Sequence, residues 1–168
     1  MAATYEPIAT TTLGSSQSSV TFGSGGTISQ AYTDLILVSN ILWSSAATKS
    51  LAVQIGNGSV DTGTNYSYTL LNGDGSTPSS DRNSNLSFGR IGIAYGSYFN
   101  SIAHFQNYSN TTTYKTILSR SNAPSGYVDS CVSLWRSTNA INVITIYVNA
   151  GANFDAGSTF TLYGIKAA

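Results

Sequence analysis

The 168-residue chain carries seven basic and seven acidic side chains, so its net charge is zero, and only 8% of its residues are charged. A chain of this length is expected to form a single domain, residues 1–168, with a core of its own. Without a basic run it lacks the electrostatic footprint of a nucleic-acid-binding protein, and no apolar run approaches the ~20 residues of a membrane helix. So little surface charge gives weak protection against self-association, which favours a protein that works inside an assembly.

The first residues and the cysteine content argue against a small secreted scaffold. Residues 1–6 have neither a basic region nor an apolar stretch, so we expect no signal peptide. Cys131 is the only cysteine, which excludes an intrachain disulfide. The fold must therefore be held by its own core.

Short extended segments and glycine-rich breaks alternate in the first third of the chain. Residues 5–13 are extended, and Pro7 places their early part at a sheet edge because proline cannot donate a ladder hydrogen bond. A second strand is expected at 19–22, ending before the glycine cluster 23–26. Residues 33–43 are apolar on both faces, so this strand should be central in a sheet or lie at a subunit contact.

The middle of the chain continues this pattern with one long polar interruption. Residues 72–85 form the longest polar stretch, which we expect to be a loop that opens with a strong turn signal. Further strands are expected at 50–55, 66–71, 86–94, 101–108, 114–120, 127–135 and 141–148. Turn signals every 8–12 residues or so are typical of an antiparallel sandwich or jelly roll.

The C-terminal segment 158–168 gives a strong strand signal. Phe160, Leu162 and Gly164 would face one side and Tyr163 the other. A strand at the end of a chain must pair with one far back in the sequence, and we expect that partner to be the segment 5–13 or its neighbour. The expected fold class is all-β: an antiparallel, jelly-roll-like β-sandwich.

Few side chains could support catalysis or bind a metal. His104 is the only histidine, and no motif surrounds it or Cys131, so a structural or interface histidine and a buried thiol are the simpler interpretations. A Cys–His nucleophile pair is formally possible. Paired acid catalysis needs two carboxylates at a fixed separation in a cleft, and no pattern indicates such a pair. We expect no enzyme activity and no cofactor.

Two polar loops carry carboxylates. Asp61 lies in one loop, and Asp74 and Asp81 lie in the other. Carboxylates that bond their own backbone at turns are the simpler interpretation. Calcium at residues 61–65 or 72–81 is the sharper alternative, although neither spacing matches an EF-hand loop.

Five segments resemble a pattern in virion proteins of tailed bacteriophages. They are residues 5–13 (YEPIATTTL), 32–38 (YTDLILV), 65–69 (NYSYT), 112–116 (TTYKT) and 157–168 (GSTFTLYGIKAA). The family that they resemble consists of small β-sandwich structural modules. The glycine cluster 23–26 departs from the pattern, because a shorter turn is expected there.

The resemblance implies a non-enzymatic virion structural protein, assembled in the host cytoplasm and often a homotrimer. The first hypothesis is a head-decoration or cement protein on the outside of the capsid, with further copies of the chain and the major capsid protein, or other virion proteins, as partners. The strand 5–13 is then the candidate contact, through Tyr5, Pro7, Ile8 and Leu13.

The alternative hypothesis is a tail-fibre or tail-tip module that recognises a glycan on the host surface. Its loops would present polar and aromatic side chains to the sugar. The candidate residues are Asp61, Asn65, Tyr66, Asp74 and Asp81. A third hypothesis, a depolymerase, would require two carboxylates at glycosidase spacing in a groove.

Overall fold

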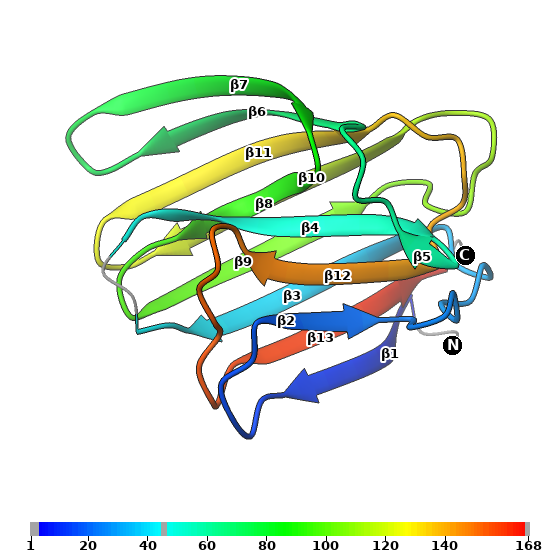
Figure 1. The fold of residues 1–168 in the computed structure, drawn as a ribbon, viewed down its shortest axis with the longest axis horizontal. Coiled ribbons are helices and arrows are strands. Elements are labelled where there is room, and N and C mark those ends of the chain that lie inside the picture. The colour runs from blue at the N-terminus through cyan, green and yellow to red at the C-terminus, as the bar shows by residue number, and fades with distance from the viewer. Residues whose placement is uncertain (1–3, 45–46, 167–168) are drawn as a thin grey trace.

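Two antiparallel β-sheets pack face to face in the computed structural model of the chain, which describes residues 4–44 and 47–166 (Figure 1). This confirms the expected all-β sandwich. The described residues do not include residues 1–3, which belong to the segment expected to lack a signal peptide. They also do not include residues 167–168, which belong to the expected last strand. Within the described ranges, no helix is long and apolar enough to cross a membrane.

Eight strands form the large sheet and five form the small sheet. The large sheet has the spatial order β1 (Tyr5–Thr12), β13 (Thr159–Ile165), β3 (Asp34–Leu42), β9 (Tyr98–Phe105), β10 (Lys115–Ala123), β11 (Tyr127–Trp135), β6 (Tyr66–Gly73) and β7 (Pro78–Leu86). The small sheet contains β2 (Ser19–Phe22), β12 (Val143–Val148) and β4 (Lys49–Asn57), with β5 (Ser59–Val60) and β8 (Gly89–Ala94) both paired to β4.

Both ends of the described chain meet in the large sheet. β1 pairs with β13 from Tyr5–Ile165 to Thr12–Thr159, so the expected partner of the last strand is confirmed. β1 is an edge strand, as Pro7 predicted, and a register shift after Pro7 interrupts the edge further. The chain alternates between the sheets through β1, β2, β3 and β4 and again through β11, β12 and β13, which gives the jelly-roll-like connectivity.

The polar stretch 72–85 is not a loop, and the sequence-based prediction was wrong here. The chain turns at residues 74–77, where Gly75 has a φ of 89°, and returns as β7 paired along β6. β7 is exposed along most of its length, so its polar side chains meet water on both faces and show no alternation. In Figure 1 the β6–β7 hairpin extends beyond the small sheet.

The space between the sheets is filled by a single apolar cluster rich in aromatic side chains. Its largest fully buried apolar members are Trp43, Tyr66, Tyr108, Phe99, Phe105, Phe154 and Phe160. Phe160 and Leu162 of the last strand point into this core, as their alternation predicted.

Strand β11 turns its polar residues inward and its aliphatic residues outward. Asp129, Cys131 and Ser133 are buried, whereas Val128 and Val132 are exposed. A half-buried strand normally places its aliphatic side chains in the core. The inward polar residues therefore need partners inside the sandwich.

Those partners lie on β8, which pairs with β4 along one edge. Buried serines of the large sheet bond the main chain of β8: Ser133 Oγ accepts from Arg90 N (2.9 Å) and donates to Arg90 O (2.8 Å). Ile93 N donates to Ser121 Oγ (3.0 Å), and Ser101 Oγ donates to Ile91 O (2.5 Å). These serine side chains thus bond N–H and carbonyl groups of β8 that would otherwise need a neighbouring strand as their hydrogen-bond partner.

Candidate functional site

The outward face of the large sheet carries an exposed aliphatic surface, which we call the outer face. Its most exposed aliphatic members come from four adjacent strands, with Leu71 65% exposed on β6, Val128 62% on β11 and Leu118 45% on β10. Val132 on β11 and Ile102 on β9 complete it. A contiguous apolar patch of this kind on a soluble protein marks an interaction surface.

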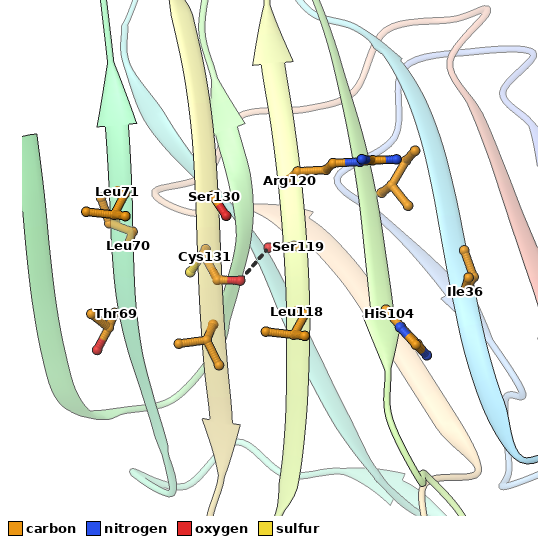
Figure 2. Close-up of a pocket in the computed structure, with 12 residues that line it drawn as sticks. Ile36, Thr69, Leu70, Leu71, His104, Leu118, Ser119, Arg120, Ser130 and Cys131 are labelled. Carbon is orange, nitrogen blue, oxygen red and sulfur yellow. Dashed lines mark hydrogen bonds between the residues drawn. The ribbon is translucent and has the colours of Figure 1, made fainter. Parts of the chain in front are cut away.

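A groove of about 540 Å³ runs across the middle of the outer face. Figure 2 shows Leu118, His104 and Ile36 on three successive strands along it, β10, β9 and β3. The strand registers place the outward residues of the groove in two cross-strand rows. One row comprises Pro7, Tyr163, Ile36, His104, Leu118, Val132, Thr69 and Arg82. The other contains Ile102, Arg120, Ser130 and Leu71.

Few charges interrupt the outer face. His104 Nε2 lies 2.8 Å from Asp34 Oδ2, so the only histidine has a structural partner at the side of the groove. Arg120 extends along the groove toward β9 in Figure 2. Among the described residues, no carboxylate lies within ion-pair distance of Arg120. The groove therefore offers an aliphatic floor and one guanidinium that a partner's carboxylate could pair with.

The whole outward side of the large sheet, of which the outer face is the part on β6, β11, β10 and β9, is large enough for a stable protein contact. Eight strands about 4.8 Å apart span roughly 34 Å, and strands of seven to nine residues are about 27 Å long, which gives a side of about 900 Å². A standard interface buries about 800 Å² on each partner. One neighbouring subunit could thus cover most of this face.

The structure separates the four residues expected to make the capsid or subunit contact. Tyr5 and Pro7 are exposed on β1, and Pro7 lies in the same row as the groove. Ile8 is partly buried against the core, and Leu13 is buried at 7% exposure. Leu13 cannot serve as a surface contact because it follows β1 into the space between the sheets.

The structure does not bring the five candidate receptor residues together. Asp61 and Asn65 precede β6, whereas Asp74 follows it, so the two loops are roughly 25 Å apart along the strand. Tyr66 is fully buried, and its hydroxyl accepts from Ile55 N (3.0 Å), so it cannot contact a receptor.

The carboxylates of these loops bond local groups, as the simpler interpretation predicted. Asp61 accepts hydrogen bonds from Gly63 N (2.8 Å) and Trp135 Nε1 (2.7 Å), and Asp74 Oδ1 accepts from Thr77 N (2.7 Å). Backbone hydrogen bonds hold the pKa of Asp74 below its usual value. Asp81 lies in strand β7 and accepts from Asn83 Nδ2 (2.6 Å), so its expected place in a loop was wrong.

The histidine and the cysteine considered in the sequence lie on opposite sides of the large sheet. His104 lies on the outer face and Cys131 points into the sandwich, so they do not form a nucleophile–base pair. Burial raises the pKa of Cys131 to about 12. Within residues 4–44 and 47–166, no three His, Cys, Asp or Glu side chains are grouped so as to hold a metal ion.

The outer face was missed at the sequence level, although one signal pointed to it. The run 33–43 is apolar on both faces, and a subunit contact was one of its two explanations. The outward residues of this run, Ile36 and Val38, are half-buried on β3, and Ile36 lines the groove. The β10 and β11 part of the face was hidden because alternation alone does not say which side faces in.

Comparisons with known proteins do not assign the chain to a family. The sequence matches no protein-family model and no curated protein. A carbohydrate-binding module (CBM40) of a Ruminococcus gnavus sialidase, bound to α2,3-sialyllactose, aligns over 92% of this chain and 94% of its own, with a TM-score of 0.32 and 10% identity. A Shewanella oneidensis protein of unknown function aligns over 100% of this chain and 82% of its own, with a TM-score of 0.23 and 9% identity.

Proposed function

We propose that the chain is a non-enzymatic structural protein of a bacteriophage virion, a homotrimeric head-decoration protein on the outside of the capsid. The observation that carries the structural role is the exposed aliphatic surface of the outer face, of which Leu71, Val128 and Leu118 are the most exposed members. Burying the exposed parts of its five aliphatic side chains would contribute on the order of 5 kcal/mol to an assembly. A surface of this kind is suited to packing against other subunits.

Charge supports the same role. The outer face combines its aliphatic side chains with the guanidinium of Arg120, which no carboxylate of the described residues pairs, and the whole chain has no net charge. Low net charge permits close packing of many copies without long-range repulsion. The virion location rests on the resemblance of the five segments to phage modules.

The head position is favoured over the tail alternative by the arrangement of the candidate residues. The glycan hypothesis requires its loop residues to converge on one exposed surface, but Asp61 and Asp74 lie at opposite ends of β6 and Tyr66 is buried. The capsid-contact hypothesis requires exposed residues on the sheet that carries the apolar face; Tyr5 and Pro7 meet that requirement, whereas Ile8 and Leu13 do not.

Incorporation of variants into particles tests this function. Leu118→Asp places a charge in the groove, and Thr21→Asp places the same charge on exposed Thr21 of the small sheet. Quantitative mass spectrometry of purified particles should find many copies of the wild type and of Thr21→Asp and far fewer copies of Leu118→Asp. Equal melting temperatures of the purified variants control for folding. Wild-type particles that lack the chain would refute the proposal.

A further inference from the structure

A polar hollow of about 250 Å³ lies between the turn of the β6–β7 hairpin and strand β8, away from the outer face. It forms where the hairpin extends beyond the small sheet (Figure 1). Its walls combine side chains from the hairpin, β8 and β11. Those that carry the argument are Asn72, Asp74, Thr77, Ser79, Arg90 and Tyr127.

A buried ion pair lies at the base of this hollow. Arg90 Nη2 donates to Asp129 Oδ2 at 2.6 Å, and the guanidinium lies 5.8 Å from the centre of the Tyr68 ring. Because the two charges neutralise each other, the base of the hollow has no net charge. Arg90 Nε and Asp129 Oδ1 are buried with no hydrogen-bond partner among the described residues. The pair therefore keeps one donor and one acceptor without a described partner, but both atoms are covered by the wall of the hollow.

The walls add further unused polar groups. Asn72 Oδ1 accepts from the hydroxyl of Ser79, while no described residue accepts from the Asn72 amide nitrogen. Asp74 uses Oδ1 for its turn, accepting from Ser76 and Thr77, and leaves Oδ2 without a described donor. Donors and acceptors thus alternate around one small space.

The ring of Tyr127 gives the hollow an aromatic side. It packs edge-to-face on Tyr95, with ring centres 4.7 Å apart, and this contact holds it in place. A fixed aromatic ring beside a few positioned polar groups is the usual composition of a small-molecule site.

We propose that this hollow binds one residue of a neutral saccharide. Hydroxyl groups both donate and accept, so they match the free amide nitrogen of Asn72 and the free carboxylate oxygen of Asp74, while the apolar side of a sugar ring can lie on Tyr127. Asp74 disfavours an anionic ligand, and among the described residues no group of carboxylates could hold a metal cation there. This site is distinct from the loop around Asp61, and it does not depend on whether the outer face assembles.

A titration followed by NMR tests the site. The ¹⁵N-labelled chain is titrated with glucose, galactose and N-acetylglucosamine separately, each to millimolar concentration. We expect saturable shifts of the Asn72 side-chain amide and of the backbone amides of Asp74 and Thr77 with at least one of these sugars. Absence of saturable shifts with all three, or shifts confined to another part of the chain, would overturn the proposal.

Two consecutive serines of β7 provide a matched pair of variants. Ser79 lines the hollow, whereas Ser80 lies opposite Leu71 on the other face of the hairpin. Ser79→Ala removes the hydroxyl that bonds Asn72 Oδ1, so the Asn72 amide is no longer held in place for the sugar. This variant should weaken sugar binding by about tenfold, and Ser80→Ala should leave it unchanged. Equal affinities of the two variants would contradict the placement of the site. Because both variants keep the outer face, this test is independent of particle incorporation.

Discussion

Replacing Ser133 with alanine should destabilise the protein markedly, although hydrophobic patterning would predict a neutral or favourable change. Ser133 is fully buried, and its hydroxyl bonds both the N–H and the carbonyl of Arg90. The substitution leaves two buried backbone groups without partners, at a cost of about 1–3 kcal/mol for each. The expected loss is roughly 2–4 kcal/mol, which lowers the melting temperature of a chain this long by roughly 5–15 °C.

Val128→Ser is the matched control on the same strand. Val128 is 62% exposed on the outer face, so its replacement should cost less than about 1 kcal/mol. Urea unfolding followed by tryptophan fluorescence measures both variants. If Val128→Ser were the strongly destabilising change and Ser133→Ala were silent, β11 would face the opposite way and the aliphatic outer face would not exist.

Three further predictions concern the interior. Tyr66→Phe removes the hydroxyl that bonds both the N–H and the carbonyl of Ile55. It should lower the free energy of unfolding, measured by urea titration, by about 1–3 kcal/mol. An unchanged unfolding midpoint would contradict these two hydrogen bonds. Burial raises the pKa of Asp61, but hydrogen bonds from Trp135 and from its own loop outweigh burial and hold the pKa below its usual value of 3.8. The ionised carboxylate therefore stabilises the folded protein above that pH, and this contribution is lost as the pH falls below it. Melting curves of Asp61→Asn should therefore vary less with pH below about 4 than those of the wild type, and parallel curves would refute this. Cys131, with its pKa raised to about 12, should react with iodoacetamide only on unfolding, so fast labelling of the native protein would show that its burial is wrong.

The sequence predicted those features of the fold that depend on local signals. Residues 127–135 were expected as a strand, and β11 has these bounds. Pro7 indicated an edge strand, and the alternation of Phe160 and Leu162 gave the buried side of the last strand. Each prediction follows from the chemistry of one residue or from a two-residue period, so no knowledge of distant contacts was needed.

Features that depend on distant partners were missed. β7 was taken for a loop because its polar residues are solvated on both faces, and only pairing with β6 makes it a strand. The inward direction of Asp129 and Ser133 depends on Arg90, about 40 residues earlier in the chain. The outer face and the polar hollow both arise because β11 places polar residues inward and aliphatic residues outward. Neither could be found before the two sheets were placed relative to each other.

The most direct test of the proposed function is a high-resolution cryo-electron microscopy map of the purified particles. The account predicts many copies of the chain on the head lattice, with Leu118 and Val132 of the outer face covered by a neighbouring subunit. A few copies at the tail would contradict head decoration. Copies on the head with the outer face open to solvent would contradict the assembly role of that face.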